Sequence, residues 1–373
     1  MNRYAHITGW GIGVPEKILT NDDLAQMVDT SDEWIVSRTG IRQRHIAEEG
    51  ETTASLGTEA ALQAMEVAGV NPNEIDLIIV STSSPEHVFP STASLIQDRI
   101  GASKAGAFDL SAACTGFIFA MNMAAQAITS GSINTAIVLG AETLSRFVNW
   151  EDRETCILFG DGAGAFVLQT SADPGGVLSS VMRSDGSGGD LLSVPAGGSK
   201  RPASSQTVQD GLHFIQMNGR EVFRFATRVM KQATEEAIEQ AGMILDDVNW
   251  VIPHQANRRI IETAARRLKM PMEKVVVNLD RYGNTSTASI PLATVEAIRD
   301  GRVKPGDLIV FVGFGAGLTW GALAARWTGP IPDEKPKVWP YRFYTLYQAY
   351  VRVRSLILRF VRFVEGVIWG KRG

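Results

Sequence analysis

Uninterrupted apolar runs recur along the first 329 residues of the chain. The segments 77–80 (LIIV), 136–140 (AIVLG) and 308–313 (LIVFVG) show no alternation with polar residues. Such runs are typical of strands that are covered on both faces. Segments of helical period lie between them, and several end at a glycine. The alternation of helices with buried strands predicts an α/β fold built in layers.

The chain carries this pattern twice. Residues 58–83 read as a helix, a glycine stop, a short link and a buried strand, and residues 231–256 repeat that order. Two similar Gly-rich segments, 159–168 and 313–323, close the two halves. Matches that recur in the same order predict two copies of one fold.

Aligning the two copies brings polar residues to the ends of strands and the starts of helices, where reactive groups gather in sheets of this type. Cys114 and Asn284 each stand 17 residues before a glycine that ends a helix, which makes them equivalent, and His254 aligns with Ser81. We therefore expect duplicated αβ halves that form a layered αβαβα sandwich. The expected boundaries are 1–175 for the half with the cysteine, 176–329 for the half with the histidine and asparagine, and 330–373 for a C-terminal extension.

Composition narrows the class of protein. A hydrophobic content of 45%, a charged content of 20% and only two cysteines indicate a globular protein of a reducing compartment. The sequence shows neither a signal-peptide pattern nor 18 consecutive apolar residues, so we expect a cytoplasmic protein. Residues 331–373 carry a net charge of +6 within a chain of −4, which leaves an acidic body and argues against nucleic-acid binding.

Cys114 lies in the segment FDLSAACTGF, between a short strand and a helical pattern. The N-terminus of a helix would favour the thiolate, lower the pKa of Cys114 and make its sulfur a nucleophile. The alternative is a buried structural cysteine, since free cysteines are among the most buried residues. His254, after Pro253, and Asn284, in a turn sequence, also have plain interpretations as an interior histidine and a turn-capping amide. Together the three form a Cys/His/Asn set spread over both halves.

Six segments resemble one family when they are taken together. They are DTSDEWIVSRTGIRQRHIA, FDLSAACTGF, ILFGDGAGA, PHQANRRI, DRYGNTSTASIP and FGAGLTWG. Over residues 1–327 the chain resembles β-ketoacyl-acyl-carrier-protein synthase III of the thiolase superfamily. The resemblance implies a thiolase-like fold and an acyltransferase that condenses an acyl-CoA with malonyl-acyl-carrier-protein.

The resemblance also implies roles for individual residues. Cys114 would carry the acyl group, while a neutral His254, with an N–H aimed at the enolate oxygen, and Asn284 would stabilise the enolate formed by decarboxylation. The backbone N–H groups of Cys114 and Ala316 would hold a second oxyanion, and Phe314 would shield the site from water. No metal or resident cofactor is implied, because the CoA thioester is a substrate.

Further positions follow from the resemblance as substrate and partner contacts. The CoA contacts would be Trp34, Arg38, Thr39, Arg153, Gly219, Phe223 and Asn257, with Trp34 and Arg153 stacked on the adenine. The acyl pocket would be formed by Leu144, Phe159, Leu191, Ile215 and, across a homodimer interface, the partner copy's equivalent of Phe89, whose bulk implies a short primer such as acetyl. The cations Arg258, Arg259, Arg266, Arg267 and Lys269 would dock the acidic carrier protein, or else form only a solvated helix face.

The extension departs from the family pattern. Gln348, Arg352, Ser355, Arg359 and Arg362 recur at helical steps of four and three, and most other residues of this stretch are apolar. A broad apolar face beside an arginine stripe indicates peripheral membrane contact through residues 340–373. Packing on the body, binding of a partner, or cleavage are the alternatives.

Three hypotheses compete for the whole chain. The first is a condensing enzyme that initiates fatty-acid synthesis. The second is a related condensing or acyl-transfer enzyme of secondary metabolism with a different primer. The third is an inactive homologue that binds carrier protein or membranes, and the intact set Cys114, His254 and Asn284 argues against it.

Overall fold

The computed structural model describes residues 2–330 and 341–369. A five-stranded sheet has the strand order β1-β7-β6-β4-β5, in which β4 runs parallel to β5 and β6 while β7 is antiparallel to both neighbours. Its strands are β1 (Tyr4–Gly13), β4 (Leu77–Ser81), β5 (Gly106–Leu110), β6 (Thr135–Glu142) and β7 (Gly162–Ser171). β6 is buried along its whole length, as its uninterrupted apolar sequence predicts.

A four-stranded sheet repeats this arrangement in the second half. Its order is β11-β12-β13-β8, with β11 parallel to β12 and β13 antiparallel to both neighbours. Its strands are β8 (Gly176–Ser184), β11 (Trp250–Pro253), β12 (Leu308–Gly315) and β13 (Thr319–Arg326). A single bridge between Val251 and Val275 stands where the first sheet has its fifth strand.

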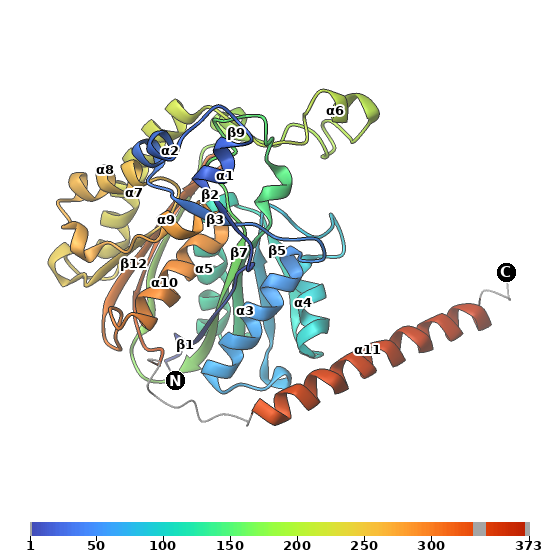
Figure 1. Cartoon of the computed structure of the whole chain (residues 1–373). Coiled ribbons are helices and arrows are strands. Elements are labelled where there is room, and N and C mark those ends of the chain that lie inside the picture. Colours follow the sequence, from blue (N-terminus) through green and yellow to red (C-terminus); the bar gives the residue numbers. More distant parts are fainter. Residues whose placement is uncertain (1, 331–340, 370–373) are drawn as a thin grey trace.

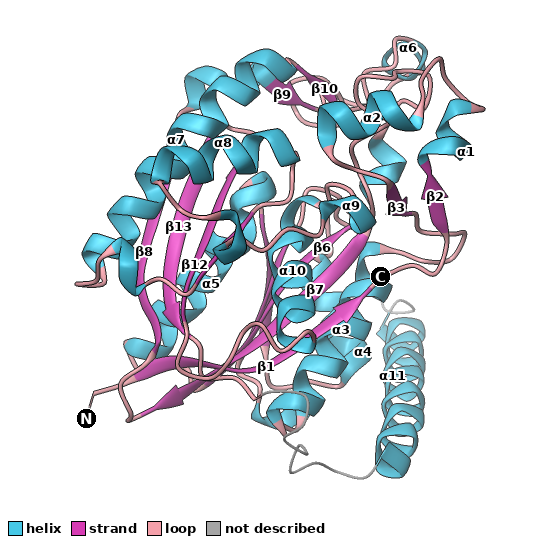
Figure 2. Ribbon diagram, turned by 60° about the vertical axis from the view of Figure 1, so that its left-hand side comes forward, coloured by secondary structure: helices cyan, strands magenta, loops and turns pink. Residues whose placement is uncertain are grey.

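Five layers stack on one another (Figure 2). The helices α5 (Gly116–Thr129) and α10 (Ser289–Arg299) lie between the two sheets and contact both. The outer layers are α3 (Thr53–Ala68) with α4 (Thr92–Ile100) on the first sheet, and α7 (Gly219–Gln240) with α8 (Arg258–Leu268) on the second. The predicted αβαβα sandwich is therefore confirmed.

Smaller elements complete the described chain. They are the strand pairs β2 (Ile18–Thr20) with β3 (Gln43–His45) and β9 (Leu192–Ser193) with β10 (Gln216–Met217), and the helices α1 (Asn21–Ala25), α2 (Asp32–Thr39), α6 (Ser205–Gln209) and α9 (Leu279–Tyr282). Short 3₁₀ turns at Ala113–Thr115 and Ser286–Ala288 lead directly into α5 and α10. The polypeptide passes from the first sheet to the second between Ser171 and Gly176.

Strand pairing fixes how the two halves correspond. Leu77 pairs with Ala136 in the first sheet and Trp250 pairs with Ile309 in the second, so equivalent residues are 173 positions apart. This offset confirms the match of Ser81 with His254.

The same offset shows that the equivalence of Cys114 with Asn284 is wrong. The offset pairs Cys114 with Thr287, and the two 3₁₀ turns and helix starts follow it. α5 has 14 residues whereas α10 has 11, so counting back from the terminal glycines misaligned the copies by three positions.

The C-terminal helix α11 (Tyr341–Trp369) lies beside α4 and extends away from the body (Figure 1). The Ser355 hydroxyl donates a hydrogen bond to the Asp98 carboxylate at 2.8 Å, and the Arg359 guanidinium lies 3.7 Å from the same carboxylate. Within the part of the chain that the structure describes, no helix is both long enough and apolar enough to cross a membrane.

Candidate active site

Cys114 is presented by a sharp connection between β5 and α5. It lies in the 3₁₀ turn Ala113–Thr115, and Ala113 just before it has a φ of 47°. A positive φ is costly for a residue with a side chain and is found where the surrounding fold enforces it. Ser286, which the offset of 173 pairs with Ala113, also has a φ of 47°. The two copies therefore share this turn, but only the first places a thiol after it.

The environment of the thiol differs from the sequence expectation. Cys114 is 8% exposed, and burial raises its pKa to about 12, against a weaker lowering by a hydrogen bond with the Ser286 side chain. The prediction that the helix N-terminus lowers the pKa of Cys114 is therefore wrong, because removal of the sulfur from water outweighs that effect. At neutral pH the sulfur keeps its proton, which must leave when the sulfur attacks.

His254 stands at the carboxyl end of β11. Its backbone N–H donates to the Val312 carbonyl at 2.8 Å, and its ring meets the Phe314 ring edge-on with centroids 5.3 Å apart. Burial lowers the pKa of His254 to about 3, so the imidazole is neutral at physiological pH, as expected. Ring atom Nδ1 lies 2.7 Å from the hydroxyl of Ser289, the first residue of α10.

Asn284 lies in the loop between α9 and the 3₁₀ turn at Ser286. Its backbone N–H donates to Leu158 at 2.8 Å, and its side-chain Oδ1 accepts the backbone N–H of Ser286 at 2.9 Å. Since Oδ1 is held by this bond, the amide group Nδ2 is the end of the side chain that remains to donate to a substrate.

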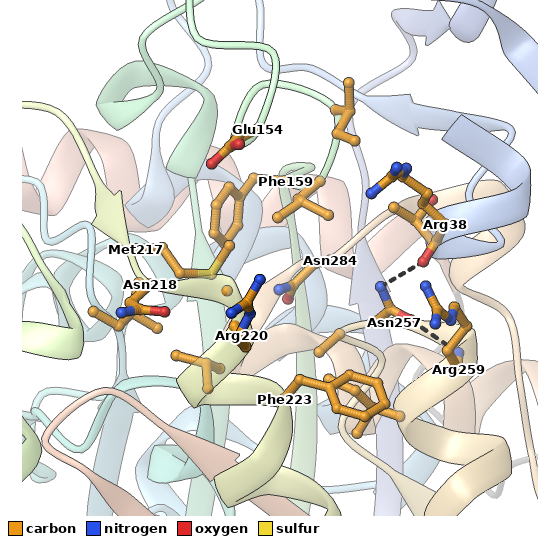
Figure 3. A pocket seen from close by; sticks show the side chains of 18 of the residues that line it. Arg38, Glu154, Phe159, Met217, Asn218, Arg220, Phe223, Asn257, Arg259 and Asn284 are labelled. Atoms are coloured by element: carbon orange, nitrogen blue, oxygen red, sulfur yellow. Dashed lines mark hydrogen bonds between the residues drawn. The ribbon is translucent and has the colours of Figure 1, made fainter. Parts of the chain in front are cut away.

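One large cavity joins the three residues. It has a volume of about 1160 Å³, and Cys114, His254 and Asn284 all line it. Every expected CoA contact also lines it: Trp34, Arg38, Thr39, Arg153, Gly219, Phe223 and Asn257. The Asn257 side chain caps the start of α8 by accepting a hydrogen bond from the Arg259 backbone N–H. Its amide Nδ2 donates to the Arg38 carbonyl at 3.0 Å, and this bond connects α8 to α2 at the wall of the cavity (Figure 3).

The aromatic stack at this cavity differs in detail from the expectation. The Arg38 guanidinium lies 4.7 Å from the centroid of the Trp34 ring and that of Arg153 lies 5.1 Å from it. Trp34 and Arg153 therefore stack on each other, and an adenine between them requires Arg153 to move. The Thr39 hydroxyl already donates to the Ile35 carbonyl at 2.7 Å, so its proton is not available to a phosphate.

A second cavity of about 480 Å³ is also lined by Cys114. Cys114, Leu144, Phe159, Ile215 and Ala316 line it, as expected of an acyl pocket. Leu191 does not line it. Instead, Leu191 packs against the core of the second half, and its neighbour Leu192 lines both cavities. Phe89 is 85% exposed and lines neither cavity of its own chain.

The two residues expected to form the second oxyanion site, Cys114 and Ala316, both line the smaller cavity. Ala316 lines the cavity of about 480 Å³ beside Cys114, and Phe314 lines the larger one. Between them, a Cβ at Gly315 would lie 2.7 Å from the Cys114 backbone nitrogen, so β12 can approach the 3₁₀ turn only through a glycine.

The cations of α8 do not form one uniform patch. Arg258 pairs with Glu262 at 2.9 Å, Arg259 lies 6.0 Å above the Phe223 ring, and Arg267 donates to the Thr227 carbonyl at 2.9 Å. Lys269 ends the helix in a left-handed conformation. All of these side chains, and that of Arg266, are exposed, but only Arg259 lines the large cavity.

Several residues at the site were not found from the sequence. Glu154, Met217, Asn218 and Arg220 line the large cavity, and Ser286 and Ser289 bond to Cys114 and His254. Glu142 is fully buried and accepts hydrogen bonds from Ser84 at 2.6 Å and from Thr287 at 3.0 Å, which links the two halves. Small hydroxyl residues clustered after Asn284 were the available signal. Among the described residues, no group of three His, Cys, Asp or Glu side chains is arranged to hold a metal ion.

Comparisons with known proteins agree with this architecture. Two sequence profiles match, that of 3-oxoacyl-[acyl-carrier-protein] synthase III at residues 108–186 and that of its C-terminal part at residues 238–327. A curated β-ketoacyl-[acyl-carrier-protein] synthase III from Symbiobacterium thermophilum is 56% identical over 321 residues, which cover 86% of this chain and 97% of the relative.

Solved structures extend the likeness. The 3-oxoacyl-[acyl-carrier-protein] synthase III of Aquifex aeolicus VF5 is 48% identical with a TM-score of 0.81, and the match covers 87% of this chain and 100% of that one. The priming β-ketosynthase of the R1128 polyketide pathway is 38% identical with a TM-score of 0.82, and the match covers 88% and 98%. With a thiolase-like fold and extensive identity over the body, the chain belongs to the β-ketoacyl-[acyl-carrier-protein] synthase III family.

Proposed function

We propose that this protein is a cytoplasmic enzyme that condenses a short acyl-CoA, with acetyl-CoA as the expected primer, with malonyl-acyl-carrier-protein and so initiates fatty-acid synthesis. The observation that carries this proposal is the single cavity lined by Cys114, His254, Asn284 and all seven expected CoA contacts. Its volume of about 1160 Å³ is at the upper end of the range of ligand pockets in proteins, which suits a large substrate such as a CoA thioester.

The reaction has two halves. In the first, the Cys114 sulfur attacks the acyl-CoA carbonyl, and the backbone N–H groups of Cys114 and Ala316 stabilise the tetrahedral oxyanion. CoA leaves and an acyl thioester remains on the enzyme. The acyl chain occupies the cavity of about 480 Å³ lined by Leu144, Phe159 and Ile215.

In the second half, the malonyl thioester enters the large cavity and loses CO₂. Asn284 Nδ2 and the His254 imidazole stabilise the enolate oxygen, while Phe314 keeps water from the reacting atoms. The carbanion attacks the acyl-Cys114 carbonyl, and the Cys114 sulfur leaves as the new C–C bond forms. This chemistry needs no resident cofactor.

Two partners belong to the proposal. Acyl carrier protein docks on the cations of α8, of which Arg259 is nearest to the substrate because it lines the large cavity. A second copy of the chain closes the acyl pocket with the loop that carries Phe89, and the 85% exposure of this large apolar side chain supports such a contact.

Intact-mass measurement of the protein tests the activity. The wild type gains an acyl group from one or more members of an acyl-CoA panel and loses it when malonyl-acyl-carrier-protein is added. Cys114→Ser gains none, whereas Cys156→Ser, which changes the other buried cysteine, is acylated normally. His254→Ala is acylated but decarboxylates malonyl-acyl-carrier-protein slowly. Full turnover by Cys114→Ser would refute the nucleophile assignment.

A second function, priming of secondary metabolism, is favoured by the likeness to the R1128 priming β-ketosynthase. The same panel separates the two. A preference for acetyl-CoA supports initiation of fatty-acid synthesis, whereas a preference for longer or branched primers supports the alternative.

We further propose that α11 holds the enzyme against an anionic phospholipid surface. Ser355 and Arg359 turn the polar side of the helix toward Asp98 on α4. The apolar side points away from the body, with exposures of 46–67% at Val353, Leu356, Ile357, Phe360, Phe363 and Val367. Residues 331–373 carry a net charge of +6, and an apolar face flanked by arginines matches the interface of an anionic bilayer.

Vesicle flotation tests the membrane contact. The full chain floats with phosphatidylglycerol-containing vesicles and less with pure phosphatidylcholine, and Leu356→Glu combined with Phe360→Glu abolishes flotation. Ile244→Glu, a matched change at a 63% exposed apolar residue of the body, leaves flotation intact. The assignment is overturned if the full chain does not float. It is also overturned if the double variant still floats but no longer forms an oligomer through this helix.

A further inference from the structure

Glu142, the last residue of β6, is a buried acid that the reaction described above does not use. Its carboxylate accepts hydrogen bonds from two segments that lie far apart in the chain. After β4, the Ser84 hydroxyl donates at 2.6 Å, and the backbone N–H groups of Ser83 and Ser84 donate at 3.0 Å and 3.1 Å. From the second half, the Thr287 hydroxyl donates at 3.0 Å. The carboxylate therefore connects the loop after β4 with the turn that follows Asn284.

The duplication of the fold shows what kind of position Glu142 occupies. The offset of 173 between the halves places Glu142 where the second half has Gly315, and Thr287 where the first half has Cys114. In each case the turn at the start of a central helix meets the last residue of a strand from the other half. At the first centre a glycine meets the turn that carries the thiol. At the second centre a carboxylate and a hydroxyl bond to each other, so this centre is a fixed support.

The turn that Glu142 holds also sets the direction of the Asn284 side chain. The Ser286 backbone N–H donates to Asn284 Oδ1 at 2.9 Å, so the amide Nδ2 is left to face the substrate. Ser286 has a φ of 47°, which is costly for a residue with a side chain and persists only where neighbouring contacts enforce it. The hydrogen bond from Thr287 to Glu142 is such a contact, because it holds the residue directly after Ser286.

We propose that Glu142 is a positioning residue for decarboxylation, and that its bond to Thr287 keeps Asn284 Nδ2 directed at the enolate oxygen. This inference rests on the proposed function and adds to it a residue that lines neither cavity. A carboxyl group suits the task because its two oxygens accept several N–H and O–H donors at once. Its complete burial keeps water from competing for these bonds.

The two half-reactions depend on this support to different degrees. Decarboxylation uses the Asn284 amide, whose direction the turn determines. Acyl transfer to Cys114 uses the backbone N–H groups of Cys114 and Ala316, and no part of Asn284. Loosening the turn should therefore slow the second half-reaction much more than the first, whereas general damage to the fold would slow both.

Thr287→Val tests the support with little change of shape, because only the hydroxyl is replaced by a methyl group. The acylated enzyme should decarboxylate malonyl-acyl-carrier-protein about tenfold to a hundredfold more slowly, while acylation of Cys114 changes by no more than about threefold. The control is Thr285→Val. Thr285 is also buried, and its hydroxyl has no hydrogen-bond partner among the described residues, so both rates should stay at those of the wild type. The inference is overturned if Thr287→Val decarboxylates as fast as Thr285→Val, or slows acylation as much as decarboxylation.

Two double variants test the route from Glu142 to Asn284. Thr287→Val added to Asn284→Ala should cause no further loss of decarboxylation, because the amide that the turn directs is already absent. Glu142→Met keeps an unbranched side chain without the carboxylate, and its loss should not add to that of Thr287→Val. A full additional loss in either double variant overturns the route. The variants of Thr287 and Asn284 leave Glu142 in place, so they decide the question even if Glu142→Met does not fold.

Failure of the proposed function has a different signature. If the wild type takes up no acyl group, or if the acylated wild type does not decarboxylate malonyl-acyl-carrier-protein, the proposed function is wrong before any variant is compared. If the wild type does both and only the variants depart from these expectations, the proposed function stands and the role given to Glu142 is wrong.

Discussion

A methyl group at Gly315 would lie 2.7 Å from the backbone nitrogen of Cys114. The last residues of β12 and the turn that carries the thiol are therefore in close backbone contact, and we expect this contact to set the distance between the Cys114 and Ala316 backbone N–H groups. Gly315→Ala should push the two segments apart. We expect a displacement of this kind to lower the rate of acyl transfer to Cys114 about a hundredfold.

The control for this change is Gly198→Ala, since a methyl group at Gly198 meets nothing within 4 Å. Stopped-flow acylation measures both variants, and circular dichroism verifies their folding. A folded Gly315→Ala protein with an undiminished acylation rate would show that the contact does not set the oxyanion geometry.

The stack on Trp34 predicts a defect that depends on the nucleotide. Arg153→Ala removes one of the two guanidinium groups over this ring, and we expect the KM for acyl-CoA to rise about tenfold. Acyl-pantetheine, which lacks the nucleotide, should be used as before. Arg299→Ala breaks a similar pair with Trp10, at 5.7 Å, and should alter neither KM. An equal loss with both substrates would contradict nucleotide binding at Trp34.

The acyl pocket predicts opposite results for two adjacent leucines. Both leucines are partly buried and pack against the core of the second half, but only Leu192 also lines the two cavities. Leu192→Ala enlarges the pocket and should raise the relative kcat/KM for primers one or two carbons longer by about tenfold or more. Leu191→Ala should lower stability without this change in preference. The same shift in both variants would argue against Leu192 as a wall of the pocket.

Buried His254 predicts acid sensitivity of the fold. Its pKa is lowered by burial from 6.5 to about 3, so between these values the unfolded chain binds a proton that the folded protein does not. The free energy of unfolding therefore falls as the pH falls below 6.5, by about 2 kcal/mol between pH 7 and pH 5.

The control for this prediction is the variant His254→Asn, whose side chain cannot take up this proton. Urea unfolding of both proteins at pH 7 and pH 5 isolates the contribution, because Glu142 and the other buried acids are common to both. Equal pH dependence in the two proteins would mean that His254 is not neutral in the fold.

The layered fold could be read from the sequence because buried strands need continuous apolar runs, as in 77–80 and 308–313, and because these runs recur in order. The match of His254 with Ser81 held because both stand 12 positions after the glycine that follows the preceding helix, Gly69 in one copy and Gly242 in the other. The match of Cys114 with Asn284 failed because it was counted through helices that differ by three residues.

Other features depend on contacts that a sequence does not record. Burial by segments distant in the chain decides the pKa of Cys114, so a local argument from the helix start gave the wrong sign. Leu191 ends the 3₁₀ turn Gly186–Leu191 and Leu192 begins β9, and the sequence does not show at which of the two the chain enters the wall of the cavities. Ser289 carries no special signal, and only its distance to His254 identifies it.

The sharing of α5 and α10 between the two sheets bears on the origin of the molecule. One continuous hydrophobic core includes Ile7 and Phe166 from the first half and Phe311 and Trp327 from the second. Either half alone would expose its share of this core to water and could not persist as a stable monomer. A single copy of this unit would therefore need a second copy against the same helix layer to cover its core, and the present chain supplies both copies in one polypeptide.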